Sequence, residues 1–384
     1  MTTSTHPTSD PQDPAAVGGR AAPGASPLGA SPLEQMSASE PTVLWNDSAD
    51  PRELAQSIAW GAVGATCNPV IAVACVKADL PRWTARMAEL AEERPTASES
   101  EIGWKIVEEI SLEAAEMLRP AYERHGGVNG RLSMQTDPRF HRNAKALADQ
   151  ADYFSSLTEN IIVKIPATST GLVAIEDAVS RGVSINVTVS FSVPQAVAAA
   201  EAIERGMEAR ESAGHDVSGM GNVVTIMCGR LDDWLKDVVK RDGVDIDPAH
   251  LEWGGIAAFK RAYAVFQEQG FRSRLLSAAF RNTGQWSELI GANAVISPPF
   301  AWQQKIQASG HVPVERIDEP VDPEILDSLL TKIPDFGRAY EPDGMTHAEF
   351  DSFGPTLKTL RQFLAADEEL DQVVRDILVP HPLG

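Results

Sequence analysis

The sequence predicts a parallel α/β protein, and the number of its strands favours a closed (β/α)8 barrel. Short apolar runs, many of them rich in β-branched residues, recur along the 384 residues and are separated by longer stretches of helical periodicity. Eight such runs occur, which is the number that a (β/α)8 barrel needs. An open, doubly wound sheet is the alternative. No Gly-x-Gly-x-x-Gly follows the first run, which argues against the dinucleotide-binding form of that fold.

The predicted strands share a short apolar core bounded by polar or turn-forming residues. They span residues 42–45, 63–66, 130–135, 161–165, 184–187, 222–227, 274–279 and 294–297. The run Ile161-Ile162-Val163 is typical of a strand buried on both faces of a parallel sheet. Amphipathic stretches between the strands predict helices over 82–93, 171–181, 194–206 and 250–270.

Three regions lie outside this alternation. Residues 1–40 are rich in Pro, Ala, Gly, Ser and Thr, so we expect a disordered tail that cannot bury enough surface to offset its ordering entropy. Residues 312–350 are rich in Pro and Asp and predict an irregular insertion in the barrel of residues 41–384. Residues 356–378 have the pattern of one long amphipathic helix, so extra C-terminal helices are expected.

Composition limits the classes of function. The formal net charge of −21 argues against a nucleic-acid partner or an anionic membrane surface, although a few arginines can still hold a small anion. No apolar run is long enough for a membrane span, and the start lacks the apolar core of a secretory signal. The three cysteines and eight histidines show no metal-ligand spacing. We therefore expect a cytoplasmic protein that binds no metal.

Lys164 interrupts the apolar strand 161–165 and raises a question of function. Lysine is rarely fully buried unless another group pairs with it or the protein uses it. One interpretation is structural: the side chain reaches water at the strand end or pairs with a carboxylate. The other is that Lys164 is a functional amine, and the polar residues at the other strand ends bear on this choice.

The carboxyl ends of all strands of a (β/α)8 barrel meet at one mouth, where active sites lie. Seven predicted strands carry polar residues at or after this end: Asp47, Thr66, Asn68, Gln135, Lys164, Asn186, Thr188, Thr225, Arg230 and Arg281. Each has a structural explanation of its own. Asp47 could cap a helix, Asn68 could serve a turn, and Arg230 could pair on the surface with Asp232 or Asp233.

Taken together, these residues suit Schiff-base chemistry. A lysine amine attacks a ketone only when unprotonated, so its pKa must fall from the ordinary value of about 10.4, and burial lowers it. The imine then withdraws electrons from the neighbouring carbon–carbon bond. A carboxylate such as Asp47, with threonine hydroxyls or water as relays, can move the protons. Two arginines suit a phosphate, which guanidinium binds through two parallel hydrogen bonds.

The motifs that carry these residues resemble the transaldolase family of class I aldolases. The segments VGATCNPVI (63–71), IIVKIPAT (161–168) and GVSINVTVSFSVPQA (182–196) are similar to the family's second, fourth and fifth strands. WNDS (45–48) stands where the family has its first-strand aspartate. GRLDDWLK (229–236) and AAFRNTGQW (278–286) resemble the two phosphate-arginine motifs. The resemblance runs from about residue 41 to 304 and resumes in the final helix.

This resemblance implies a TIM barrel that transfers a dihydroxyacetone unit between sugar phosphates without a cofactor. It implies Lys164 as the imine-forming nucleophile, Asp47 as the acid and base for carbon–carbon cleavage, and Thr188 as the holder of the catalytic water. Gln135 completes the catalytic set. The substrate-binding residues would be Thr66, Asn68, Asn186, Thr225, Arg230 and Arg281. Oligomeric state stays open, with a homo-oligomer as one option.

The sequence departs from the family's transaldolases at three places. Gln135 stands where a glutamate is usual, and the fructose-6-phosphate aldolase branch resembles this chain there. Ala279 replaces a serine that touches the phosphate, and Thr225 and Met227 replace a serine and an aromatic residue. Two alternatives therefore remain: aldol cleavage that releases dihydroxyacetone, and a non-catalytic barrel that binds sugar phosphates.

Overall fold

Eight short parallel strands close into one barrel, in the order in which they occur in the sequence. The computed structural model describes residues 31–39 and 41–382. The strands are β1 (Val43–Asn46), β2 (Ala62–Cys67), β3 (Arg131–Gln135), β4 (Ile161–Pro166), β5 (Ile185–Thr188), β6 (Val223–Ile226), β7 (Arg274–Ala278) and β8 (Val295–Ser297). Each lies within one residue, at either end, of a strand predicted from the sequence. The predicted (β/α)8 barrel is confirmed.

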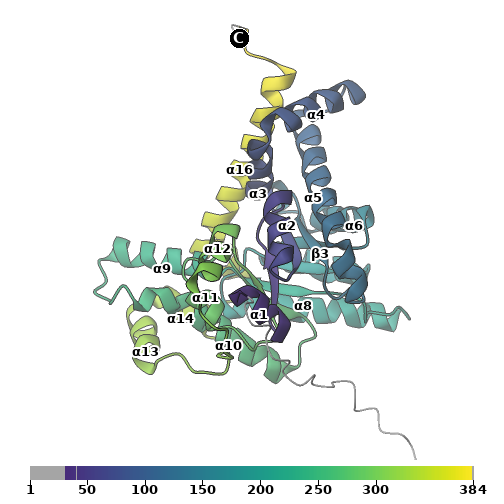
Figure 1. The fold of residues 1–384 in the computed structure, drawn as a ribbon. Coiled ribbons are helices and arrows are strands. Elements are labelled where there is room, and N and C mark those ends of the chain that lie inside the picture. Colours follow the sequence, from purple (N-terminus) through teal and green to yellow (C-terminus); the bar gives the residue numbers. More distant parts are fainter. Residues whose placement is uncertain (1–30, 40, 383–384) are drawn as a thin grey trace, which may run out of the picture.

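Helices surround the barrel (Figure 1). Those between the strands and directly after β8 are α2 (Pro51–Ala59), α3 (Pro69–Ala78), α4 (Leu80–Glu93), α5 (Glu99–Arg124), α6 (Ala144–Leu157), α7 (Ser169–Ser180), α8 (Val193–Ser212), α9 (Cys228–Asp242), α10 (Gly254–Gln269), α11 (Gly284–Ser287) and α12 (Phe300–Ser309), with 3-10 turns η1 (Pro138–Phe140) and η2 (His250–Trp253). Several begin at a side chain that accepts a backbone N–H, among them Asp50 for α2 and Thr168 for α7. These caps fix where the loops at the barrel mouth end.

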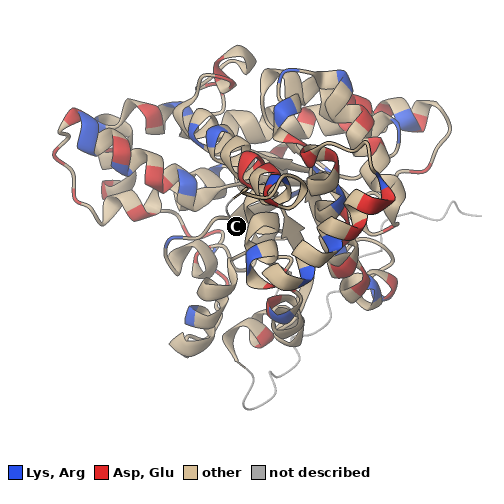
Figure 2. Ribbon diagram, turned by 90° about the horizontal axis from the view of Figure 1, so that it is seen from above, with Lys and Arg blue, Asp and Glu red and all other residues tan. Residues whose placement is uncertain are grey.

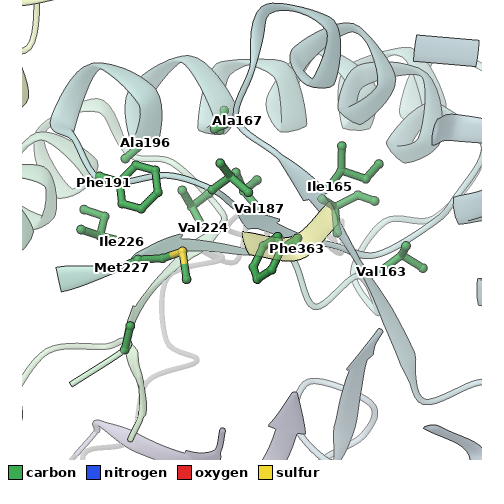
Figure 3. Close-up of a cluster of buried hydrophobic side chains, with 14 of the residues drawn as sticks. Val163, Ile165, Ala167, Val187, Phe191, Ala196, Val224, Ile226, Met227 and Phe363 are labelled. Carbon is green, nitrogen blue, oxygen red and sulfur yellow. The ribbon is translucent and has the colours of Figure 1, made fainter. Parts of the chain in front are cut away.

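Side-chain alternation along the strands separates an outer core from the barrel interior. The outer layer, between strands and helices, includes Val163, Ile165, Val187, Val224 and Ile226 (Figure 3). Ile162 belongs instead to a cluster inside the barrel. Because successive side chains of a strand point to opposite faces, Lys164 points inward as Ile162 does.

The N-terminal region differs in part from the expected tail over residues 1–40. Residues 1–30 and 40 lie outside the described part of the chain. Pro32–Ser39, however, form helix α1, which packs on α12. Leu33 and Met36 are fully buried there, and the Leu33 N–H donates to Gln307 Oε1 over 3.0 Å. The expectation of disorder is corrected for these residues, because the surface that they bury belongs to distant elements that local composition does not reveal.

The segment 312–350 was predicted to be irregular, and this is wrong for most of it. It contains helices α13 (Pro323–Lys332), α14 (Pro334–Tyr340) and α15 (His347–Phe350). Pro323 and Pro334 do not break these helices, because each stands in the first turn, where the missing N–H costs nothing. Phe336 and Phe350 are fully buried and anchor the segment to the outer core.

The predicted long helix is present as α16 (Gly354–Leu378), which packs along α3, α5 and α4 (Figure 1). Arg139, the middle residue of η1, forms ion pairs with this helix: its guanidinium lies 3.0 Å from Asp367 and 3.4 Å from Asp371. Basic and acidic positions are interspersed over the helices (Figure 2). None of the helices in the described ranges has the length and apolar content that crossing a membrane requires.

Candidate active site

A cavity at the carboxyl ends of the strands collects most of the predicted site residues. Eight of the ten line it: Asp47, Thr66, Asn68, Lys164, Asn186, Thr188, Thr225 and Arg230. Apolar side chains complete the wall, among them Met227, Leu276 and Phe363. The cavity volume is about 50 Å³, which holds only a few water molecules. Phe363 comes from α16, so this helix covers the mouth.

The Lys164 amine lies in this cavity on β4, and the residue is 6% exposed. Burial lowers the pKa of Lys164, and the positive charge of Arg230 lowers it further, while the Asp47 carboxylate acts in the opposite direction. No residue in the described ranges forms a hydrogen bond or ion pair with its Nζ atom. The structural interpretation of Lys164, an amine that reaches water or pairs with a carboxylate, therefore does not describe its surroundings.

Asp47 lies in the turn after β1, with its side chain fixed by β2. The Thr66 hydroxyl donates to Asp47 Oδ1 over 2.6 Å. The cap of α2 is Asp50, so the alternative that Asp47 caps a helix does not hold. A carboxylate oriented in this way beside a buried amine is placed to accept or donate a proton.

Two side-chain amides lie in the cavity in different settings. Asn186 Oδ1 accepts from the Thr225 hydroxyl over 2.8 Å, and its Nδ2 donates to Ser133 Oγ over 2.8 Å. These contacts fix the amide but leave one Nδ2 hydrogen for a ligand. Asn68 Oδ1 accepts the Ile71 N–H over 3.0 Å, so this oxygen caps helix α3 and does not serve the turn that was offered as an alternative. The Asn68 amide nitrogen has no hydrogen-bond partner among the residues that the structure describes.

Gln135 does not line the cavity, but it lies next to it. In the β3–β4 register Gln135 is the direct partner of Lys164, so both side chains point to the barrel interior. Its Oε1 atom is buried and has no hydrogen-bond partner in the described chain. A buried acceptor without a partner is uncommon and marks a place for a water or a ligand hydroxyl.

Arg230 connects the barrel mouth to α16. Its Nη1 donates to Gln362 Oε1 over 2.6 Å and to Thr359 Oγ1 over 3.3 Å, and its guanidinium lies 5.6 Å from the centroid of the Phe363 ring. Its Nε is buried and has no partner in the described chain. The predicted alternative of a surface pair with Asp232 or Asp233 is therefore wrong.

Arg281 is not brought into the cavity. Its guanidinium forms an ion pair with Asp233, with Nη2 and Oδ2 2.8 Å apart. Its Nη1 also donates to the carbonyl oxygens of Ala279 and Phe280, each over 3.0 Å. Its positive charge is close enough to contribute to the lowered pKa of Arg230, after the larger effect of burial. The two arginines are neighbours, but only Arg230 faces the cavity.

A close contact between the two arginine segments depends on Gly229. A Cβ at this position would lie 1.9 Å from the Ala279 carbonyl oxygen and 2.7 Å from Arg281 Cγ. Ala279 itself has a φ of 60°, which is strained for a residue with a side chain. Only a residue without a side chain lets α9 begin this close to the end of β7.

We therefore expect Gly229→Ala to destabilise the protein by about 1–3 kcal/mol, the usual cost of forcing extra atoms into a packed site. Urea unfolding measures this. Gly219→Ala is the control, because a Cβ there meets nothing within 4 Å. Its effect should stay below about 0.5 kcal/mol. Equal effects of the two substitutions would contradict the argument.

Residues of α16 were not among the predicted site residues. Thr359, Gln362 and Phe363 contact Arg230, and Phe363 also lines the cavity. The amphipathic pattern of 356–378 predicts the helix and its apolar face, but not the surface on which that face packs. No group of His, Cys, Asp and Glu side chains in the described residues is arranged to hold a metal ion.

The fold is a (β/α)8 barrel, and its candidate site is the cavity at the carboxyl ends of its strands, around a buried lysine. The sequence matches the family described as Transaldolase/Fructose-6-phosphate aldolase over residues 44–340. The chain belongs to this family, which confirms the resemblance seen in its motifs.

Several bacterial proteins named as transaldolases are similar to the chain. It is 28% identical over 240 residues to Transaldolase 1 of Streptomyces avermitilis, covering 62% of this chain and 63% of that protein. It is 33% identical over 208 residues to a transaldolase of Mycobacterium ulcerans (54% and 55%), and 31% identical over 252 residues to one of Thermobifida fusca (62% and 66%). The chain thus spans between half and two thirds of the length of these relatives.

Proposed function

We propose that this protein is a transaldolase, which transfers a dihydroxyacetone unit between sugar phosphates through a Schiff base on Lys164. The observation that carries the proposal is the buried Lys164 amine, with its lowered pKa, in one cavity with Asp47 and Arg230. An amine kept neutral attacks carbonyl carbon, which an ordinary surface lysine does poorly. Membership of the family and the relatives named transaldolase also support the proposal.

The proposed reaction begins with attack of Lys164 Nζ on the ketose C2 carbonyl and loss of water to give an imine. Asp47 then takes the proton of the C4 hydroxyl while the C3–C4 bond breaks. The bond's electrons move into the imine, which becomes an enamine, and an aldehyde leaves. The enamine next attacks the aldehyde carbon of an acceptor sugar, and water releases the new ketose. Asp47, oriented by Thr66, returns its proton in the second half.

Substrate groups are assigned from the donors that remain available. The amide nitrogens of Asn68 and Asn186 would hold hydroxyls of the dihydroxyacetone unit, and the unpaired Gln135 Oε1 would accept from a hydroxyl or a water. Thr188 would hold the water that hydrolyses the imine. Arg230 would bind the phosphate. We assign Arg281 a supporting charge only, because Asp233 occupies its guanidinium.

The small cavity implies that α16 shifts when a substrate binds. About 50 Å³ does not contain a sugar phosphate, and Arg230 Nη1 is already bonded to Gln362 and Thr359. A phosphate at Arg230 would therefore replace these two contacts.

Gln362→Leu consequently should lower the KM for a phosphorylated ketose by up to roughly tenfold, since one competing hydrogen bond to a charged group is lost, and kcat should change little. Steady-state kinetics with fructose 6-phosphate checks this. Gln372→Leu, on the same helix but bonded to Asp376, is the control. An unchanged KM in Gln362→Leu would show that Gln362 does not compete with the phosphate.

Two measurements test the function itself. Borohydride added with fructose 6-phosphate should fix a three-carbon adduct on Lys164, located by mass spectrometry. Turnover should require an acceptor such as erythrose 4-phosphate, because the enamine otherwise has no aldehyde to attack. Labelling at another residue, or none with several ketoses, would overturn the Schiff-base mechanism. Steady release of free dihydroxyacetone without an acceptor would replace transfer by aldol cleavage.

A further inference from the structure

A second cavity, separate from the one around Lys164, lies against another flank of α16. Its volume is about 540 Å³, within the range of small-molecule sites. Leu360, Arg361 and Leu364 of α16 line it, whereas Gln362 and Phe363 contact Arg230. With about 3.6 residues per turn, these two sets lie roughly 150° apart around the helix axis. The body of α16 therefore separates the two cavities.

One wall of this cavity is apolar. It is formed by Leu357, Leu360 and Leu364, which repeat at helical spacing along α16. Leu357 is 48% exposed, and it is one of the few large apolar side chains of the described chain that is open to this extent. A sugar phosphate, which is polar throughout, would gain nothing from such a wall. A ligand with an apolar body would bury it.

Two arginines bring positive charge to the same cavity from different elements. Arg142 lies in the loop between η1 and α6, and Arg361 lies on α16. Neither forms a hydrogen bond or ion pair with any residue in the described ranges. Most other arginines of the described chain are paired, as Arg139 and Arg281 are. Two unpaired guanidinium groups at one cavity are therefore unusual in a chain with a net charge of −21.

The acidic group at this cavity does not neutralise the arginines. Asp351 is the one acidic side chain among the described residues that line it. Its Oδ1 accepts the Ser169 N–H over 2.8 Å, and its Oδ2 contacts the Ser169 hydroxyl. The carboxylate is thus held at the N-terminus of α7, where the helix dipole favours negative charge. Both of its oxygens are already bonded there, so the two guanidinium groups remain available to a ligand.

We propose that this cavity binds a small organic anion, a phosphate, sulfonate or carboxylate joined to an apolar body. Arg142 and Arg361 bind the anionic group, and the three leucines of α16 cover the apolar part. Guanidinium binds such anions through charge-assisted hydrogen bonds, which are stronger than neutral ones. The site does not depend on the proposed transaldolase reaction, because none of these residues lines the cavity of Lys164.

Titration of the full chain with 8-anilinonaphthalene-1-sulfonate, a fluorescent sulfonate with an aromatic body, tests the proposal. We expect saturable binding of one probe per chain. The double variant Arg142→Ser/Arg361→Ser should weaken it at least tenfold, since each charge-assisted hydrogen bond contributes about that factor. Phenyl phosphate should displace the probe at a lower concentration than inorganic phosphate does, because only the former has an apolar body.

Two controls make the outcome decisive. Arg94→Ser/Arg124→Ser removes the same charge at two exposed positions outside the cavity and should leave the affinity within about twofold. Arg230→Leu removes the arginine of the other cavity and should also leave the affinity unchanged. Circular dichroism confirms that each variant is folded. The proposal is overturned by a lack of saturable binding, by equal losses in both double variants, or by loss in Arg230→Leu alone.

Discussion

Lys164→Met is expected to abolish turnover and borohydride labelling together, because methionine fills the same space without the amine to which we assign imine formation. Lys260→Met is the matched control. Lys260 is also largely buried, but it bonds to Glu288 and to the carbonyl oxygens of Arg316 and Glu319 outside the cavity. This variant should keep both labelling and turnover. Residual labelling in Lys164→Met would assign the nucleophile to another lysine.

The same substitution should make the protein more stable at neutral pH. Burial lowers the pKa of Lys164 in the folded chain below its unfolded value of about 10.4. Below the unfolded pKa, folding must therefore remove a proton or bury a charge, and this cost disappears as the pH rises past that value. The free energy of unfolding of Lys164→Met should exceed that of the wild type at pH 7, and the gap should narrow toward pH 10. A pH-independent gap would contradict this account.

Asp47→Asn is expected to lower turnover by about 10²- to 10⁴-fold, the usual contribution of a positioned acid and base, while imine trapping persists. The asparagine keeps the shape of the side chain but cannot take the C4 hydroxyl proton. Thr66→Val, which removes only the hydrogen bond to Asp47, should have a smaller effect. Single-turnover kinetics separates cleavage from imine formation. If trapping is lost with cleavage, Asp47 acts before the carbon–carbon bond breaks.

The pH dependence of trapping gives this prediction a second measurement. The Asp47 carboxylate favours the charged form of Lys164, and the Arg230 guanidinium opposes it. Removing Asp47 should therefore extend trapping to lower pH. Removing Arg230 should raise the pH at which trapping begins. The pH profiles of trapping in the two variants should therefore shift in opposite directions. Shifts in the same direction would mean that neither charge acts directly on the amine.

Most of the barrel could be predicted from the sequence because its signals are local. Short apolar runs indicate the strands. Because successive side chains of a strand point to opposite faces, Lys164 of β4 points into the barrel once Ile162 is assigned to the inner face and Val163 to the outer one. A closed parallel barrel then brings all strand ends together, whatever the loops do. This is why residues far apart in the chain, such as Asp47 and Arg230, were predicted to share one mouth and do line one cavity.

The remaining features depend on contacts between distant segments. The packing of α16 over the mouth, the burial of α1 and the three helices of 323–350 each rest on partners that a local pattern does not identify. Arg281 lies outside the cavity because its guanidinium forms an ion pair with Asp233. The catalytic and binding roles of the site residues stay predictions, to be decided by the variants above.

The alternation of inward and outward side chains along the barrel strands also makes this protein a practical starting point for directed evolution. Outward residues such as Val163 and Ile165 pack against the helices, whereas inward ones such as Thr225 and Ala278 line the cavity around Lys164. Libraries that vary only the inward positions can be screened for new substrates, because the packing between strands and helices is left unchanged. The side chains that set specificity and those that stabilise the fold thus lie on opposite faces of the same strands.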